Sequence, residues 1–276
     1  MPPGAAAGDI LRPLPTASSS GGPLLSTAHL EIIGHRGFSA RAPENTLIAV
    51  RAALEAGADA EEWDMHVAAC GTAGLIHDAT LDRSTDGTGP VGALTVQQLR
   101  RLDAGTWFHP VFAGERIPTF SEALEEVRPY GATVYAEVKG YRRAEDLEGM
   151  VRVVREMGMS RHTVFISLDF GIVDHLSGLP GESRMGYVVS RHRQFQDAVG
   201  RARRLPGRGL VDLSHQLVLE DPDLVPRARA QGVDVAVWTV DDPREAEALA
   251  EAGVRRFTTN QVESLVKWRA RQRQGV

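Results

Sequence analysis

The chain has 276 residues, of which 42% are hydrophobic and 24% are charged, a composition typical of globular proteins. The net charge of −5 argues against a nucleic acid as the main partner, and no apolar stretch is long enough to span a bilayer. The length suits one large domain or two small ones, and α/β barrels often occupy this size alone.

Residues 1–28 are rich in proline, glycine, alanine and serine. They lack the basic start and apolar run of a secretion signal, so we expect a flexible leader. A single domain is then expected over residues 29–276. The chain contains one cysteine, Cys70, so no intrachain disulfide can form. The single cysteine and the absence of a secretion-signal pattern together predict a cytoplasmic protein.

From residue 30 onward, short apolar runs alternate with longer amphipathic segments. Eight successive strand–helix units predict a parallel sheet that closes into a TIM (β/α)8 barrel. An open doubly wound sheet is the alternative, but no glycine-rich dinucleotide fingerprint follows the first strand. The predicted barrel strands are 31–34, 60–66, 133–138, 163–167, 184–189, 209–213, 233–238 and 255–258.

Apolar residues at helical spacing predict helices after most of these strands. In the first helix this spacing is carried by Leu47, Val50 and Leu54. The helical pattern is weakest in the arginine-rich segment 190–207. The predicted helices are 43–56, 120–130, 144–157, 221–231, 242–252 and 262–272. The expected caps are Ser121 and Asp242 at N-termini, and Gly57, Gly158, Gly232 and Gly253 at C-termini.

A further strand candidate, 73–77, follows the second strand after only a few residues. A parallel crossover needs a dozen or more residues, so this link must be a β-hairpin. Residues 80–118 are then rich in turns and contain one short helical run, 95–102. We interpret them as a small insertion in a loop of the second unit. Long loops of this kind usually carry function or cover a site.

Ionisable residues stand at the C-terminal ends of the predicted strands, where barrels of this type place reactive side chains. The second strand carries Glu62, Asp64 and His66 at alternate positions, so all three can face one cavity. The third barrel strand ends in Glu137 and Lys139, again on one face. Carboxylates from two neighbouring strands could bind a hard divalent cation through oxygen.

Histidines and a further basic residue occur at the same ends. The first strand ends in His35 and Arg36, and the returning hairpin strand ends in His77. Two histidines can form an acid–base pair near neutral pH, and arginine suits a forked grip on phosphate oxygens. Metal, two histidines, arginine and lysine together are typical of a phosphoryl-transfer site.

A series of short motifs runs through the chain: His35-Arg36-Gly37, Pro43-Glu44-Asn45-Thr46, Glu62-x-Asp64, His77-Asp78, Glu137-x-Lys139, Trp238-Thr239-Val240 and Thr258-Thr259-Asn260. The series resembles the ordered motifs of the glycerophosphodiester phosphodiesterases. The resemblance extends from about His35 to Gln261. Each motif is weak alone, but the full series in this order is highly specific.

This resemblance implies a fold, a reaction and residue roles. The family cleaves glycerophosphodiesters into glycerol 3-phosphate and an alcohol with a divalent cation, Mg²⁺ or Ca²⁺. Residues 80–118 would match a small insertion that lies over the site. The implied roles are acid–base catalysis for His35 and His77, metal binding for Glu62, Asp64 and Glu137, and phosphate binding for Arg36 and Lys139.

Some side chains at the expected site have a structural alternative. Trp238 could form a wall of the substrate site, pack in the core, or do both. His66 could lie beyond the cavity, although it is in phase with the two carboxylates before it. Glu44 is expected to brace the site rather than to react. Glu61 and Trp63 depart from the family's usual residues and should point away from the cavity.

The leading prediction is therefore metal-dependent hydrolysis of a small glycerophosphodiester, by water or by way of a cyclic phosphate. One alternative is a lysophospholipase D-like or cyclising lipid phosphodiesterase, which an exposed apolar rim at Phe108, Val111 and Phe112 would favour. The other is a catalytically silent phosphodiester-binding module. The presence of both histidines and all three carboxylates argues against it.

Overall fold

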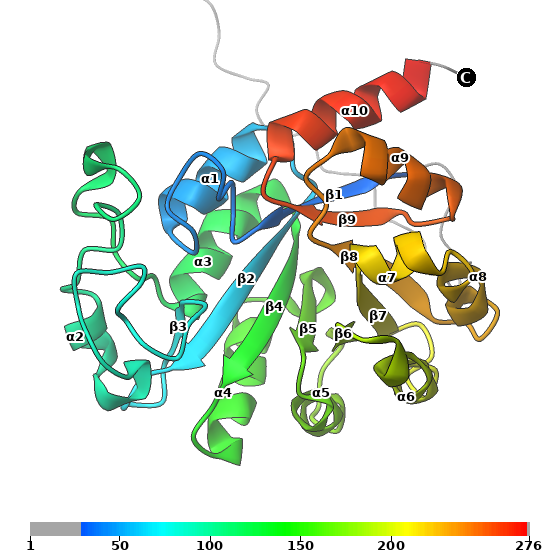
Figure 1. The fold of residues 1–276 in the computed structure, drawn as a ribbon. Helices are drawn as coiled ribbons and strands as arrows, with labels where there is room; N and C mark the ends of the chain where they lie inside the picture. The colour runs from blue at the N-terminus through cyan, green and yellow to red at the C-terminus, as the bar shows by residue number, and fades with distance from the viewer. Residues whose placement is uncertain (1–28, 275–276) are drawn as a thin grey trace, which may run out of the picture.

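The computed structural model describes residues 29–274, so the predicted leader lies outside the described residues. Eight parallel strands close into a barrel, because β1 pairs with β2 on one side and with β9 on the other (Figure 1). The predicted TIM barrel is confirmed, and the open sheet is excluded. The barrel strands are β1 (Glu31–His35), β2 (Ala60–Val67), β4 (Thr133–Gly140), β5 (Thr163–Ser167), β6 (Arg184–Val189), β7 (Gly209–Ser214), β8 (Asp234–Trp238) and β9 (Arg256–Thr259).

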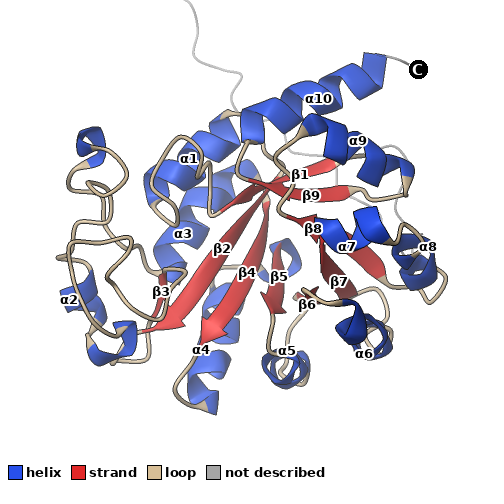
Figure 2. Cartoon of the chain, in the orientation of Figure 1, coloured by secondary structure: helices blue, strands red, loops and turns tan. Residues whose placement is uncertain are grey.

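Helices surround the barrel and cover the outer face of the sheet (Figure 2). Asp242 is an N-cap as predicted, and all four glycines expected near C-termini have the positive φ that ends a helix. No helix of residues 29–274 is long and apolar enough to cross a membrane. The helices are α1 (Leu47–Glu55), α2 (Val96–Leu99), α3 (Phe120–Val127), α4 (Ala144–Glu156), α5 (Phe170–Ser177), α6 (His192–Ala202), α7 (His215–Glu220), α8 (Leu224–Arg229), α9 (Pro243–Glu251) and α10 (Val262–Gln274).

The predicted start of the first helix was wrong. The helix begins at Leu47 rather than at Pro43, because the chain first turns through Asn45, which has a φ of 58°. Thr46 then supplies the N-cap, and its hydroxyl accepts a hydrogen bond from the backbone N–H of Ala49. The residues before α1 are thereby free to take part in the site.

The N-cap of α3 is Thr119, not Ser121 as predicted. The Thr119 hydroxyl accepts a hydrogen bond from the backbone N–H of Glu122, whose carboxylate accepts one from the backbone N–H of Thr119. This reciprocal capping box satisfies two backbone donors that would otherwise lack partners. Ser121 therefore lies inside the first turn of the helix.

The later helices differ more from the prediction. The predicted helix over 221–231 is present only as the shorter α8, because the backbone leaves the helical region at Asp221, and α7 before it was not predicted. α5 was not predicted, although Asp169 caps it by accepting a hydrogen bond from the backbone N–H of Gly171. The arginine-rich segment 190–207 does contain a helix, α6.

The predicted hairpin is present, and β3 (Ala73–Leu75) pairs antiparallel with β2. Residues 80–118 follow it as turns and short helices beside the hairpin (Figure 1). They have an apolar cluster of their own that also takes in residues of the hairpin, so the insertion is anchored to β2 and β3. The buried members are Ala68, Ile76, Leu81, Val91, Leu99, Ala104 and Ile117.

The barrel interior is layered, because every second residue of a strand faces inward. The middle layer is mainly apolar and includes Ile33, Ala60 and Leu210. Below it, at the N-terminal ends of the strands, lies a charged layer in which Arg256 contacts Glu31 and Asp234. Such buried ion pairs at the end opposite the reactive side chains have a structural role. The site forms in the layer above the apolar one.

On the outer face of β2, Glu61 is fully buried. Its carboxyl group lies against Gly34 beside Ala53 of α1, and neither oxygen makes a well-formed hydrogen bond with a described residue. Burial raises the pKa of Glu61 well above its ordinary value, so the folded protein holds this acid protonated. Trp63 packs into the outer core, so both side chains point away from the cavity as predicted.

Replacing Glu61 with leucine is predicted to raise the free energy of unfolding by about 1–3 kcal/mol at pH 8, because a buried acid without a well-formed hydrogen bond is removed. The folded pKa lies above the unfolded one, so Glu61 costs more stability as pH rises past its unfolded pKa. The gain should therefore be smaller at pH 5. Urea unfolding at both pH values measures it, with exposed Glu55→Leu as the control. An equal gain at both pH values would contradict this explanation.

Candidate active site

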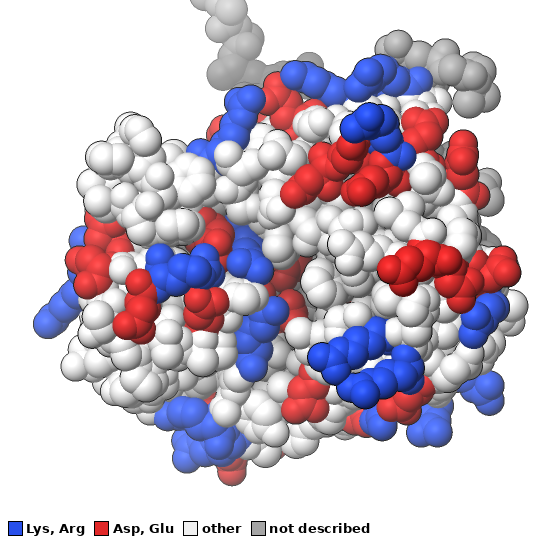
Figure 3. Space-filling model, viewed as in Figure 1, with Lys and Arg blue, Asp and Glu red and all other residues white. Residues whose placement is uncertain are grey.

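A cavity of about 330 Å³ opens at the C-terminal ends of the barrel strands. Figure 3 shows acidic side chains deep in a hollow near the middle of the molecule, with basic side chains beside them. Most of the predicted site residues line this cavity, and Asp64 lies buried among them. The lining residues are His35, Arg36, Glu62, His77, Glu137, Lys139, Ile166, Leu168, Val188, Asp212, Trp238, Thr239 and Thr258.

The three predicted metal ligands lie together. One carboxylate oxygen each from Glu62, Asp64 and Glu137 lies within 4.8 Å of the others. Alternation along β2 brings the first two to one face, and Glu137 of β4 stands in register with Asp64. Each residue also has a buried oxygen that makes no well-formed hydrogen bond with any described group. Clustered carboxylate oxygens with incomplete hydrogen bonding fit Mg²⁺ or Ca²⁺.

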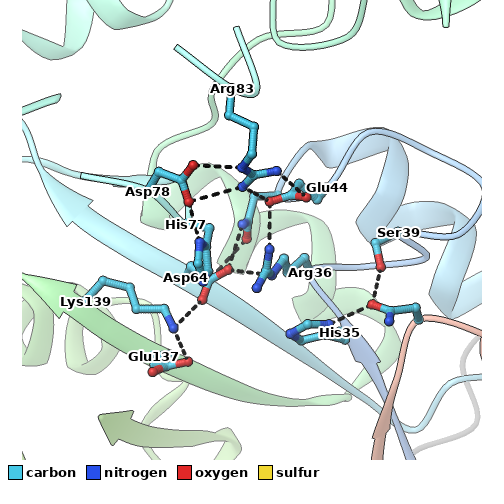
Figure 4. Close-up of polar contacts among 12 residues, drawn as sticks. His35, Arg36, Ser39, Glu44, Asp64, His77, Asp78, Arg83, Glu137 and Lys139 are labelled. Carbon is cyan, nitrogen blue, oxygen red and sulfur yellow. Dashed lines mark hydrogen bonds and ion pairs between the residues drawn. The ribbon is translucent and has the colours of Figure 1, made fainter. Parts of the chain in front are cut away.

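Two basic side chains reach these carboxylates. Arg36 Nε lies 2.9 Å from Asp64 Oδ2, and Lys139 Nζ lies 3.2 Å from Asp64 Oδ1 and 2.8 Å from Glu137 Oε2 (Figure 4). Burial opposes ionisation of Asp64, but Arg36 and Lys139 outweigh it and lower the pKa of this carboxyl. Burial and the two neighbouring carboxylates raise the pKa of Glu62. Both basic groups also face the cavity, where they could bind an anion.

His35, at the end of β1, is held by an amide. Its Nδ1 lies 2.7 Å from Oδ1 of Asn260, which Asp241 holds from the other side. An amide oxygen can only accept, so Nδ1 carries the proton and Nε2 is left unprotonated, 3.8 Å from Glu62 Oε2. Burial and the nearby Arg36 lower the pKa of His35 to about 4. The ring is therefore neutral at pH 7 and able to accept a proton.

His77, after β3, is held by a carboxylate instead. Its Nδ1 lies 2.5 Å from Asp78 Oδ1, which leaves Nε2 for the cavity. Arg83 of the insertion donates to Asp78 through Nε at 2.7 Å. The hydrogen bonds from Arg83 lower the pKa of Asp78 to about 2, so this carboxylate is ionised. The two histidines thus have different hydrogen-bond partners.

Glu44 joins the two halves of the site (Figure 4). Its Oε1 accepts hydrogen bonds from Arg36 Nη1 at 2.9 Å and from Arg83 Nη2 at 2.7 Å. Next to it, Asn45 donates to Asp64 Oδ2 at 3.0 Å and accepts from the backbone N–H of Asp64 at 3.1 Å. The structure therefore places Glu44 as a brace, as expected from the sequence.

Replacing Arg83 with methionine is predicted to lower kcat by about 10–100-fold with little change in KM. Without Arg83, Asp78 would no longer be fixed in place and would orient His77 less well. Steady-state kinetics on a glycerophosphodiester measures the effect, and Arg83→Lys should recover part of it. Arg100→Met, an exposed change in the same insertion, is the control. A lowered melting temperature with unchanged kcat would show a structural role alone.

His66 lies beyond the cavity, one of the two positions that the sequence left open for it. The register between β2 and β4 shifts between Met65 and His66, so alternation along the strand is broken there. His66 Nε2 lies 3.1 Å from the backbone oxygen of His77, and the ring does not line the cavity. Trp238 packs against the barrel core and also lines the cavity, which are the two positions considered for it from the sequence.

Several polar residues that hold the candidate site residues were given no role from the sequence. Arg83 lies in the turn-rich insertion, where nothing local marks it as part of the site. Asn260 was noted only within the Thr258-Thr259-Asn260 motif, and Asp241 was not noted. Asn260 follows β9 and reaches His35 on the neighbouring β1, and Asp241, after β8, in turn holds Asn260. Their positions after strand ends were the signal that could have indicated this arrangement.

Comparison with known proteins decides the family. The chain matches the glycerophosphoryl diester phosphodiesterase family over residues 35–264. The chain belongs to this family. A glycerophosphodiester phosphodiesterase of Caldanaerobacter subterraneus subsp. tengcongensis is 30% identical over 239 residues, which cover 85% of this chain and 96% of that protein. The family and enzyme class predicted from the motifs are confirmed.

Solved structures of this family have the same fold. A glycerophosphodiester phosphodiesterase from Agrobacterium tumefaciens is similar with a TM-score of 0.73 and 30% identity, covering 86% of this chain and 99% of that one. A phosphodiesterase from Oleispira antarctica, solved in complex with its product sn-glycerol 3-phosphate, gives a TM-score of 0.77 at 26% identity. That match covers 87% of this chain and 96% of the Oleispira chain.

Proposed function

We propose that this chain hydrolyses glycerophosphodiesters to glycerol 3-phosphate and an alcohol, with a divalent cation held by Glu62, Asp64 and Glu137. The observation that carries the proposal is one cavity in which three carboxylates, two histidines and two basic side chains meet. Family membership and the product bound to the Oleispira antarctica relative support it.

Arg36 and Lys139 would hold the phosphate. Both are charged, both face the cavity, and both are positioned by Asp64. Arginine offers a planar fork to phosphate oxygens, and lysine adds a compact positive charge. Mg²⁺ or Ca²⁺ at the carboxylates would add Lewis-acid stabilisation of the negative charge that develops on the phosphate. Trp238 would contribute a wall of the substrate site.

The two histidines would divide the proton transfers according to their partners. His35, held by the neutral amide of Asn260, would accept a proton from the attacking hydroxyl through Nε2. The oxygen of that hydroxyl would bond to phosphorus as the bond from phosphorus to the leaving alcohol breaks. His77, held through Nδ1 by Asp78, would give its proton to the departing alkoxide. The attacking hydroxyl is water or the neighbouring hydroxyl of the glycerol moiety.

Product analysis tests this proposal. Glycerophosphocholine, glycerophosphoethanolamine and glycerophosphoglycerol are incubated with the protein in Mg²⁺, Ca²⁺ or EDTA, and products are identified by ³¹P NMR. We expect metal-dependent appearance of glycerol 3-phosphate. A cyclic phosphate that precedes it would identify the internal hydroxyl as the attacker. No product from any of the three substrates would reject this substrate class.

One observation favours a lipid substrate as the second candidate. The insertion exposes Trp107 and Val111, with 39% and 74% of their surfaces accessible. Phe108 lies between Trp107 and Phe112 in edge-to-face contacts, with ring centroids 5.8 Å and 5.6 Å apart. An apolar tip beside the site could contact an acyl chain. Release of lysophosphatidate from lysophosphatidylcholine, faster than glycerol 3-phosphate from glycerophosphocholine, would support this candidate over the first.

A further inference from the structure

Asp212 lines the cavity, but the mechanism above gives it no task. Residues alternate along β7, so Leu210 and Asp212 share the inward face. Leu210 belongs to the apolar middle layer, and Asp212 stands one step nearer the C-terminal end of the barrel. The same step leads from Ala60 to Glu62 on β2. Asp212 therefore lies in the layer that holds the reactive groups.

The position of β7 sets Asp212 across the cavity from the metal-binding strand. In the closed strand order, β7 lies four strands from β2 in either direction. Asp212 is thus on the wall across the cavity from β2, and it is not among the three carboxylates that lie within 4.8 Å of one another. A phosphate bound by Arg36 and Lys139 would leave this far wall to the organic part of the substrate.

The carboxyl group of Asp212 is buried and has no partner. Only 3% of the residue surface is exposed, and no described residue donates a hydrogen bond to its side chain. Burial without a hydrogen bond is unfavourable for a polar group, so buried polar groups are normally paired. An unpaired acid in the wall of a cavity is therefore positioned to meet a group that enters the cavity.

The surroundings of Asp212 indicate what that group is. Ile166 and Val188 add aliphatic surface to the same wall, and the indole N–H of Trp238 donates to the backbone carbonyl oxygen of Asp212 at 3.1 Å. This half of the cavity is thus an apolar wall with an acid set into it. A short carbon chain that carries hydroxyl groups matches both features, since its carbons contact the wall and its hydroxyls meet the acid.

The charge state of Asp212 agrees with a hydroxyl partner. Burial and the Glu137 carboxylate raise the pKa of Asp212 well above its ordinary value, against the opposing effect of Lys139. A carboxyl group with a raised pKa repels the phosphate less, and in its protonated form it can both donate and accept a hydrogen bond. A cationic head group would instead require an ionised acid at this position.

We propose that Asp212 is a substrate-binding residue that hydrogen-bonds the free hydroxyls of the glycerol moiety, with Ile166 and Val188 packed against its carbons. This inference rests on the proposed function, because it takes the phosphate to be bound by Arg36 and Lys139. It makes Asp212 the residue that distinguishes a phosphorylated polyol from the phosphate ester of a simple alcohol.

Calorimetric binding of two phosphate monoesters tests the inference. The full chain, in Mg²⁺, is titrated with sn-glycerol 3-phosphate and with ethyl phosphate, which lacks the free hydroxyls. Asp212→Leu should weaken binding of glycerol 3-phosphate about 10-fold and leave ethyl phosphate within about twofold, since one or two hydrogen bonds are lost. Asp212→Asn, which still donates and accepts, should retain part of the preference. Asp197→Leu, an exposed change on α6, is the control.

Each other outcome overturns the inference. Equal weakening of both ligands would show a general change in the cavity, and unchanged binding would make Asp212 a core residue only. Thermal melting of Asp212→Leu separates misfolding from these cases, and Asp212→Ala repeats the test if the leucine variant fails to fold. If the wild-type chain neither binds glycerol 3-phosphate nor releases it from a glycerophosphodiester, the proposed function fails, and this inference fails with it. The wild-type chain could instead bind and release glycerol 3-phosphate while Asp212→Leu and Asp212→Asn keep its preference for glycerol 3-phosphate over ethyl phosphate. In that case the inference alone fails.

Discussion

Replacing His77 with asparagine is expected to lower kcat on glycerophosphocholine by about 10²–10⁴-fold, the usual contribution of general acid–base catalysis. His77 Nδ1 is held by Asp78, and Asp78 is held by Arg83, so the ring is fixed with Nε2 toward the cavity. Asparagine cannot deliver a proton to the leaving alkoxide. Steady-state rates of glycerol 3-phosphate release measure the loss.

The leaving group provides a sharper form of this test. A p-nitrophenyl ester of glycerol phosphate has a leaving group that needs no protonation. His77→Asn should therefore lower kcat far less with this substrate than with glycerophosphocholine. His35→Asn should reduce the rates of both substrates alike, because His35 would act on the attacking hydroxyl. His175→Asn, an exposed change on α5, is the control. Equal losses from His77→Asn on both substrates would contradict its role as the acid.

Replacing Glu62 with glutamine is expected to reduce the metal-dependent rate by about 10³-fold or more. Loss of Lewis-acid stabilisation costs several kcal/mol, and each 1.36 kcal/mol changes a rate about tenfold. The variant should also need more Mg²⁺ or Ca²⁺ to reach half of its maximum rate. Because neighbouring carboxylates and burial raise the pKa of Glu62, we expect the metal-free variant to be no less stable than the wild type.

Direct binding separates this prediction from a simple loss of activity. Titration with Mn²⁺, followed by electron paramagnetic resonance, reports occupancy of the site without turnover. The wild type should bind one ion per chain tightly, and Glu62→Gln should bind it more weakly. Glu148→Gln, an exposed change on α4, should behave as the wild type. Unchanged Mn²⁺ affinity in Glu62→Gln would remove this residue from the metal site.

The barrel and its reactive residues were predictable because they depend on local patterns. Short apolar runs marked each barrel strand, and strand ends bring reactive residues to one face in any closed parallel sheet. His35, Glu62 and Glu137 therefore could be placed together without coordinates. The expected hairpin followed from the length of its connection alone.

What could not be predicted depends on distant parts of the chain. Arg83 reaches Glu44 and Asp78 only because the insertion folds back onto the hairpin. Asp212 lines the same cavity as Glu62 only because the sheet closes. The position of His66 could not be decided because a register shift breaks the alternation of β2, and no residue of that strand marks it.

Release of glycerol 3-phosphate from glycerophosphocholine, with Mg²⁺ and with EDTA, is the most direct test of the central claim. The structure predicts release in Mg²⁺ that stops in EDTA and resumes when metal is restored, because three carboxylates without full partners face the cavity. A rate that EDTA leaves unchanged would contradict the metal site. No release in any metal would contradict the proposed reaction itself.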